Sequence, residues 1–288
     1  MKISKSYLFA LVFAALGFLY VQYEAELPRD ELRAMLGKNK YPLKGKTAVV
    51  TGSTSGLGMA IATELYGFGA QVYVVGRSPD KLARVAAAIR ETGQGTPGSI
   101  QTEILDTSDL ESVKNFAEGL LAVFGDDNHI DYLVNNAGIH HVSSGDAALV
   151  PSKQEFDMAF ATNYLGHFLL TELLLPSMAD NGRIVQVSST MHMMSDATML
   201  RTMTSEEAPL AAQHLPDDSW HQAAAYGNNK LAQVLHAREL QRQLVRKGSG
   251  IKVLSICPNW VNTGILPDDI GGRFVASQAF SPTAGSLS

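Results

Sequence analysis

Short apolar runs alternate along this chain with longer stretches that have helical periodicity. The apolar runs, rich in β-branched residues, cover 47–52, 71–76, 100–105, 130–134, 183–188 and 252–256. The helical stretches cover 56–68, 79–91, 109–124, about 153–178 and 222–247. The runs are mostly apolar throughout, as in strands that are covered on both faces. This alternation predicts parallel βαβ units and an α/β fold with a doubly wound parallel sheet.

The amino-terminal segment does not follow this pattern. Residues 7–23 carry no charge, and lysines precede them while acidic residues follow. As a helix these 17 residues would extend roughly 25 Å, just short of a hydrocarbon core of about 30 Å. We expect an uncleaved membrane anchor over 1–23, a charged tether over 24–43 and one folded domain over 44–288. A removed secretory signal and a buried or interfacial helix are the alternatives, although no small-residue cleavage site follows the run.

The charges around the anchor and its length bear on the location of the protein. A span of this length suits a thin bilayer such as that of the endoplasmic reticulum. Positive charge before the span and acid after it favour a cytosolic amino terminus. No Asn-x-Ser/Thr sequon supports a lumenal domain. We expect a protein of the endoplasmic reticulum membrane and leave open whether the domain faces the lumen or the cytosol.

The composition excludes several functional classes. The 288 residues are 45% hydrophobic and 18% charged, which excludes a disordered or collagen-like chain. A formal net charge of -5 without a run of Lys or Arg argues against nucleic-acid binding. Cys257 is the single cysteine, so the chain can form no internal disulfide. No zinc-ligand spacing is present, and we expect no metal.

A glycine-rich turn joins the first predicted strand to the first helix. Its residues are Gly52, Ser53, Thr54, Ser55, Gly56, Leu57 and Gly58. Gly52 permits a tight turn, Gly56 lets the backbone approach a pyrophosphate, and Gly58 lets the helix pack closely on the sheet. The phosphates of a dinucleotide would lie at the helix N-terminus.

Arg77 follows the second predicted strand, about 20 residues after the glycine turn. An acidic residue at this place would bind the ribose 2′-hydroxyl of NAD, whereas a guanidinium suits a 2′-phosphate. Arg77 therefore favours NADP(H) over NAD(H) as the cofactor. The alternative is an ordinary surface arginine beside a loop.

Tyr226 and Lys230 are four residues apart on the last predicted helix and therefore share a face. A nearby ammonium favours the phenolate, so Lys230 should lower the pKa of Tyr226 toward a value useful for proton transfer. Ser188 and Ser189 end the preceding strand, at the sheet edge where such folds bind ligands. A hydroxyl there could hydrogen-bond a reacting oxygen, but strand alternation alone does not choose between the two serines.

Together these motifs resemble the ordered signature of the short-chain dehydrogenase/reductases, over about residues 44–288. The matching positions are TGxxxGxG at 51–58, Asn135-Asn136-Ala137-Gly138, Asn163, Ser189, Tyr226-x3-Lys230 and Pro258-x4-Thr263. The residues most similar to the retinol dehydrogenase and WW-domain oxidoreductase branch are Asn163 to Thr171, Ser188-Ser189-x-x-His192 and Arg77. The resemblance implies a Rossmann-type fold, NADP(H), and interconversion of an alcohol and a carbonyl on a lipophilic substrate.

The resemblance also implies a role for each matching residue. Tyr226 would be the acid/base, Lys230 would lower its pKa and hold the nicotinamide ribose, and Ser189 would orient the carbonyl. Asn163 would position a water that connects Lys230 to solvent. The other cofactor contacts would be Asp106 with adenine, Asn136, Ala137 and Gly138 with adenosine, and Val261 and Thr263 with the nicotinamide carboxamide and the phosphates.

Several of these residues also have ordinary structural interpretations. Asn163 could lie on a helix surface, and Ser189 could cap the end of a strand. Asp106 could belong to an N-cap cluster for the helix that begins near Asp109. The pair at 140 and 141, both histidine, is interpreted as loop residues beside the pocket, because no carboxylate or cysteine completes a metal site. His192 is expected in the pocket wall.

The segment between Ser189 and Tyr226 is rich in methionine. Five of the ten methionines lie there, at 191, 193, 194, 199 and 203. Because thioether side chains adapt to irregular apolar shapes, this segment is a candidate lid over a lipid-like ketone, retinoid or sterol. The alternative is that these methionines pack on the domain core.

The chain departs from the family pattern near its end. Pro258-Asn259 stands where the family usually has Pro-Gly. After Ser281-Pro282, which is typical of a helix start, only six residues remain, so we expect the last helix and strand of the family fold to be lacking.

The prediction is a membrane-anchored, NADP(H)-dependent oxidoreductase of a lipophilic alcohol or carbonyl compound. Its expected partners are this small substrate, the membrane and, for a homodimer, a second copy of the chain. The alternatives are a nucleotide-binding but catalytically silent interaction protein and a truncated form that does not fold stably.

Overall fold

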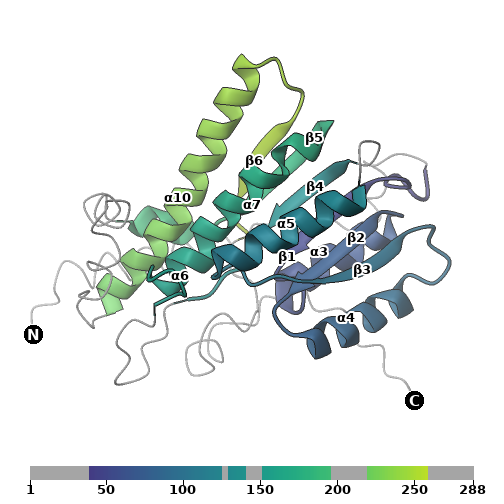
Figure 1. Cartoon of the computed structure of the whole chain (residues 1–288), viewed down its shortest axis with the longest axis horizontal. Helices are drawn as coiled ribbons and strands as arrows, with labels where there is room; N and C mark the ends of the chain where they lie inside the picture. Colours follow the sequence, from purple (N-terminus) through teal and green to yellow (C-terminus); the bar gives the residue numbers. More distant parts are fainter. Residues whose placement is uncertain (1–38, 125–128, 141–150, 196–218, 259–288) are drawn as a thin grey trace, which may run out of the picture.

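The computed structural model describes residues 39–124, 129–140, 151–195 and 219–258, and a parallel sheet lies at its centre (Figure 1). Its strands are β1 (Thr47–Thr51), β2 (Gln71–Gly76), β3 (Ser99–Ile104), β4 (Ile130–Asn135), β5 (Met178–Val187) and β6 (Lys252–Ile256). Their order across the sheet is β3-β2-β1-β4-β5-β6, and all neighbouring pairs are parallel. The order reverses between β1 and β4, the place where doubly wound sheets bind ligands. The predicted Rossmann-type fold is confirmed.

Helices cover both faces of this sheet. They are α3 (Gly56–Gly67), α4 (Pro79–Thr92), α5 (Leu110–Phe124), α6 (Met158–Phe160), α7 (Gly166–Leu174) and α10 (Ser219–Arg246), with a π-helical turn η1 (Ala161–Leu165) and 3-10 turns η2 (Leu175–Ser177) and η3 (Thr190–Met194). Val49 and Leu133 belong to a core that includes residues of α5, α7 and α10. Val50 and Val134 belong to a second core, with α3 and α4. Because β1, β2 and β4 contribute to both cores, their sequences are mostly apolar, whereas the edge strands β3 and β6 each contribute to one core.

The helix expected over 153–178 is shorter and less regular than the sequence pattern predicts. It begins at Met158, because the carboxylate of Asp157 accepts a hydrogen bond from the Phe160 amide at 2.7 Å and caps the first turn. It then passes through the π-helical turn η1 into α7, which ends at Leu174 just before Pro176. Proline lacks the amide that a continuing helix needs. Strand β5 therefore starts at Met178, five residues before the predicted start at 183.

The carboxyl end of the predicted tether packs on the domain. The Tyr41 hydroxyl donates to the Gly95 carbonyl at 2.8 Å, and the Leu43 amide donates to the Phe68 carbonyl at 3.0 Å. The anchor over 1–23, most of the tether and the segment beyond 258 lie outside the described residues. Among the helices that the structure describes, none combines the length and hydropathy of a membrane span.

Candidate active site

The glycine turn has the backbone geometry that its sequence predicts. Gly52 and Gly56 have φ of 62° and 50°, in the region that disfavours other residues. A Cβ on Gly52 would lie 2.7 Å from Cα of Ala137, and one on Gly58 would lie 2.5 Å from the Gly52 carbonyl oxygen. The glycine turn therefore packs in direct contact with the residues that follow β4. Gly56 and Ser55 are exposed where α3 begins, which leaves the helix N-terminus accessible to an anion.

Ser53, in the middle of this turn, uses its side chain within the protein. Its hydroxyl donates to the Val50 carbonyl at 2.8 Å and accepts from the Val75 amide at 2.9 Å. The residue is fully buried. The side chain of Ser53 therefore joins β1 to β2, and any contact of this residue with a cofactor would come from its backbone.

Arg77 lies beside the glycine turn. It follows Gly76, and a Cβ on Gly76 would lie 2.7 Å from Cγ2 of Thr54. The end of β2 therefore contacts the glycine turn, and the exposed Arg77 is the next residue after this contact. A guanidinium at this place can reach a negatively charged group bound near the helix N-terminus.

Asp106, which follows β3, takes part in a local turn. Its Oδ1 accepts from the Ser108 amide at 2.9 Å and from the Ser108 hydroxyl at 2.6 Å, and its own amide donates to the Ser112 hydroxyl at 3.0 Å. This geometry is a local turn ahead of α5, and the carboxylate that bonds an amide in the first turn of α5 is that of Asp109, which accepts from the Glu111 amide at 3.1 Å. The two side-chain bonds of Asp106 end on one carboxylate oxygen.

The end of β4 is tied to the glycine turn through Thr51. The amides of Asn136 and Ala137 both donate to the Thr51 hydroxyl oxygen, at 2.8 and 2.9 Å. The Asn136 side chain donates to the Thr51 carbonyl at 2.9 Å. Sequence reasoning had given Thr51 no role of its own, although a polar residue at the end of an apolar strand was a usable signal.

Asn163 lies in the π-helical turn η1 and is fully buried. Its side chain accepts from the Ile139 amide at 2.8 Å and donates to the Ile139 carbonyl at 2.9 Å. The surface position considered from the sequence is therefore wrong. A Cβ on the neighbouring Gly138 would lie 3.4 Å from Oδ1 of Asn163 and 3.6 Å from Nζ of Lys230, so the three residues meet.

Tyr226 and Lys230 share a face of α10, as their spacing predicts, and both are buried. Nζ of Lys230 donates to the Val187 carbonyl at 2.9 Å and lies 5.5 Å from the centre of the Tyr226 ring. Burial lowers the pKa of Lys230 to about 8. Burial also raises the pKa of Tyr226 to about 12. For the protein alone burial raises this pKa, so the lowering by Lys230 that the spacing predicts is not found there.

The two serines after β5 have different surroundings. Ser188 is buried, and its hydroxyl donates to the Lys230 carbonyl at 2.9 Å, which fixes the end of the strand to α10. Ser189 is only partly buried, and its hydroxyl accepts from the Met191 amide at 3.2 Å. Of the two, Ser189 has the hydroxyl that is left to donate to a bound molecule.

Gly227 lets η3, which follows Ser189, pack closely against the turn of α10 that carries Tyr226. A Cβ on Gly227 would lie 2.6 Å from the Met191 carbonyl oxygen and 3.2 Å from the Ser195 amide nitrogen. The helix α10 can approach η3 this closely only without a side chain at 227. Sequence reasoning missed Gly227, which stands beside Tyr226 and holds its turn of helix near Ser189.

Two histidines border this site. The His140 ring centre lies 4.8 Å from that of Tyr226. Nδ1 of His192 lies 2.6 Å from the Ser189 carbonyl oxygen, which requires this nitrogen to donate, and 3.9 Å from Sγ of Cys257. His141, Val261 and Thr263 lie outside the described residues. Within the described ranges, no three of His, Cys, Asp and Glu are grouped as metal ligands.

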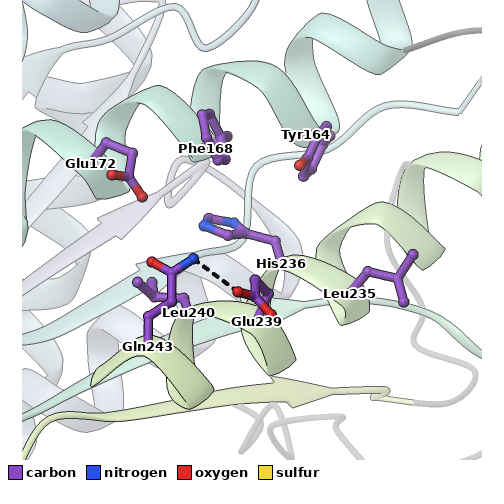
Figure 2. A pocket seen from close by; sticks show the side chains of 8 residues that line it. All are labelled: Tyr164, Phe168, Glu172, Leu235, His236, Glu239, Leu240 and Gln243. Carbon is purple, nitrogen blue, oxygen red and sulfur yellow. Dashed lines mark hydrogen bonds between the residues drawn. The ribbon is translucent and has the colours of Figure 1, made fainter. Parts of the chain in front are cut away.

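A separate pocket opens between α7 and α10 (Figure 2). It is lined by Tyr164, Phe168, Glu172, Leu235, His236, Glu239, Leu240 and Gln243. On α10 these positions are rotated away from the face that carries Tyr226 and Lys230. This pocket is therefore not the place where the site residues meet.

Comparison with known proteins supports the family resemblance that the sequence motifs indicate. The short chain dehydrogenase family matches residues 46–200. Retinol dehydrogenase 11 of Homo sapiens is 33% identical over 264 residues, covering 90% of this chain and 74% of that protein. Retinol dehydrogenase 14 of Mus musculus is 32% identical over 248 residues, covering 83% of this chain and 67% of that protein. The crystal structure of a short chain dehydrogenase from Burkholderia cenocepacia in complex with NADP has 26% identity and a TM-score of 0.58, and 79% of each chain is covered.

A doubly wound sheet, a glycine turn at its switch point and a buried Tyr-Lys pair at the same edge define an oxidoreductase of the dinucleotide-binding class. The chain belongs to the short-chain dehydrogenase family and is similar to its retinol dehydrogenases. This membership supports a nicotinamide cofactor.

Proposed function

We propose that this protein is an NADP(H)-dependent reductase or dehydrogenase of a small lipophilic substrate, with Tyr226 as its acid/base. The observation that carries the proposal is the meeting of Gly138, Asn163 and Lys230 beside Tyr226, at the sheet edge that also bears the glycine turn. When bound, the nicotinamide supplies or accepts a hydride at a carbonyl carbon. The residues of the chain supply the proton and hold the reactants.

The residues along the sheet edge fit a dinucleotide. The exposed start of α3 and the turn from Gly52 to Gly58 would hold the phosphates, because backbone amides there have no helical partners. Gly138 leaves open the space in front of Asn163 and Lys230 that a Cβ would fill. Asn136, Ala137 and Gly138 would line the adenosine side, together with Asp106, and Val261 and Thr263 would hold the nicotinamide side.

Arg77 supports NADP(H) over NAD(H). Its position beside the turn suits the additional phosphate of NADP, and no acidic side chain replaces it at the end of β2. Structures of short-chain relatives in complex with NADP, at 26% and 28% identity, are consistent with this choice.

The protonation states favour reduction of a carbonyl. With a pKa of about 12, Tyr226 is a neutral phenol near neutral pH and can donate a hydrogen bond, and then its proton, to the carbonyl oxygen. Burial thus disfavours the phenolate that oxidation of an alcohol would use as a base.

Lys230, Ser189 and Asn163 would hold and orient the reactants. Lys230 is mostly an ammonium near neutral pH and would bind the ribose hydroxyls, and Ser189 would donate a hydrogen bond to the substrate oxygen. Asn163 already bonds Ile139 through both of its side-chain groups. We therefore assign Asn163 the task of fixing Ile139 and Gly138 beside Lys230, in addition to the water-holding role implied by the family resemblance.

The apolar side chains beside Ser189 support a lipophilic substrate. Met193 and Met194 are 62% and 37% exposed, although methionine is usually buried. Their flexible thioethers suit a retinoid, a sterol or another lipid-like carbonyl. Met199 and Met203 lie outside the described residues. Anchoring in the endoplasmic reticulum membrane through 1–23, and self-association as a homodimer, belong to the same proposal.

The test is NADPH consumption by the purified full-length chain with a panel of retinoid, steroid and simple aliphatic aldehydes and ketones. The expected result is turnover of at least one apolar carbonyl and none with Tyr226→Phe. Thermal melting with NADPH is measured in parallel, because a ligand of the native state raises the melting temperature. NADPH binding without any turnover would instead favour the catalytically silent interpretation.

A further inference from the structure

His167 is a buried histidine that lies behind the proposed active site. It is the second residue of α7 and is 1% exposed. One ring nitrogen, Nδ1, lies 3.0 Å from the Asn163 carbonyl oxygen, and the other, Nε2, lies 2.8 Å from the Thr51 hydroxyl oxygen. His167 therefore connects the π-helical turn that holds Asn163 to the strand that ends in the glycine turn.

The partners of His167 determine where its proton lies. A carbonyl oxygen can only accept, so Nδ1 carries the proton and donates to Asn163. The Thr51 oxygen already accepts from the amides of Asn136 and Ala137, which uses both of its lone pairs. Its hydroxyl proton faces two acceptors, Nε2 of His167 at 2.8 Å and the Val134 carbonyl oxygen at 3.4 Å, and we assign it to the nearer Nε2. The hydrogen bonds run in one direction, from the end of β4 through Thr51 and His167 to the Asn163 carbonyl.

A protonated His167 does not fit this network. A second N–H at Nε2 would face an oxygen that has no lone pair left. Burial is the largest effect that disfavours a charged ring, the bond to the Asn163 carbonyl opposes it, and Lys230 and His236 of α10 add to it. These effects hold the pKa of His167 at about 4. The ring is therefore neutral and has one defined tautomer at all moderate pH values.

The Asn163 carbonyl that His167 binds has one more donor, Nε2 of Gln233 on α10, at 2.8 Å. The carbonyl is thus fixed by two side chains, one from α7 and one from the helix that carries Tyr226 and Lys230. The side chain of the same Asn163 holds Ile139, next to Gly138. A shift of the Asn163 backbone would therefore move the loop that stands against Lys230.

We propose that His167 is a positioning residue of the active site: as a neutral Nδ1–H donor it fixes the Asn163 carbonyl and thereby the loop from Gly138 to Ile139 beside Lys230. The expected effect of His167 on turnover rests on the proposed function. The hydrogen-bond network itself is independent of any reaction.

Three variants of the full-length chain distinguish the contributions of the two ring nitrogens of His167. His167→Asn keeps a donor where Nδ1–H stands, His167→Gln keeps a polar group only toward Thr51, and His167→Phe keeps neither. We expect His167→Phe and His167→Gln to lower kcat on the order of 10- to 100-fold, with smaller changes in KM. Small displacements of reacting groups have effects of this size. We expect Asn to restore kcat to within about threefold of the parent. Equal losses in Asn and Gln would overturn the proposal.

Two readouts do not depend on turnover, and the first of them uses only the parent protein. In the parent protein, ¹⁵N NMR of the histidine rings should show His167 as the neutral Nδ1–H tautomer down to about pH 5. A neutral Nε2–H ring or a protonated ring at that pH would contradict the network. Hydrogen exchange at the Ile139 amide should accelerate at least about tenfold in His167→Phe and stay close to the parent rate in His167→Asn. If the parent binds NADPH but turns over no substrate, the proposed function fails while these two readouts still decide the role of His167.

Discussion

Replacing Lys230 by Met should stabilise the fold while it abolishes catalysis. Lys230 is 3% exposed, and burial lowers its pKa from 10.5 to about 8. This difference corresponds to about 3 kcal/mol by which burial disfavours the ammonium, at about 1.4 kcal/mol per pH unit. Methionine has a similar length and no charge, and it adapts to apolar surroundings.

The gain is reduced by one lost hydrogen bond. Nζ of Lys230 donates to the Val187 carbonyl, and losing this donor costs about 1 kcal/mol. The expected net gain is about 2 kcal/mol near neutral pH, or about 5 °C in melting temperature for a domain of this size. Turnover should fall by at least about 100-fold, because the proposed ribose contact and the charge beside Tyr226 are lost together.

The pH dependence of this gain provides a sharper test. Between about pH 8 and 10.5 the unfolded chain binds more protons at Lys230 than the folded protein does, so parental stability rises with pH in this window. The advantage of Lys230→Met should therefore shrink by about pH 10.

Lys46→Met is the matched control for this substitution. Lys46 is half exposed and donates to Asp131 at 2.8 Å, and that bond raises its pKa. The stabilisation it gives is present below its ordinary pKa and is lost only as pH rises through the raised value. The control variant should therefore show a small loss of stability that does not change between neutral pH and about pH 10. Thermal melting followed by circular dichroism measures both variants. A lower melting temperature of Lys230→Met near neutral pH, or a gain that does not depend on pH, would refute the reasoning.

Three further predictions concern one or two positions each. Arg77→Glu should weaken NADPH binding at least about tenfold and leave NADH binding largely intact, as measured by protein fluorescence; equal loss for both cofactors would contradict the role of Arg77. Gly52→Ala should lower the melting temperature and abolish cofactor binding, because a Cβ at positive φ would lie 2.7 Å from Cα of Ala137; Gly45→Ala, also at positive φ but with open space, is the control. Exchanging Met193 and Met194 for Ser should raise KM for apolar carbonyls more than for short ones, and an unchanged KM would exclude a substrate contact.

The features that the sequence predicts well are those with a fixed local pattern. Apolar runs separated by helix-length segments identify parallel strands regardless of their surroundings. The glycine turn and the Tyr226-Lys230 spacing depend only on backbone geometry within a few residues. These elements are found in the structure near the predicted positions, with the earlier start of β5 as the largest difference.

Features that depend on surroundings could not be predicted in the same way. Ser53 and Ser55 are equally polar in the sequence, but Ser53 lies against β2 and uses its hydroxyl there, while Ser55 is exposed. The raised pKa of Tyr226 follows from burial, which a four-residue spacing does not reveal. The link between Thr51 and His167 spans 116 positions of the chain and needs the packing of α7 on β1.

The most direct test of the proposed reaction is the transfer of the hydride itself. The full-length protein is incubated with NADPH in which deuterium replaces both hydrogens at the reactive nicotinamide carbon, and with the carbonyl compound that supports the fastest turnover. The predicted result is an alcohol with one deuterium on the former carbonyl carbon, formed by the parent protein and not by Tyr226→Phe. An alcohol without deuterium, or equal product from both proteins, would contradict the assignment of Tyr226 as the proton donor in a hydride transfer.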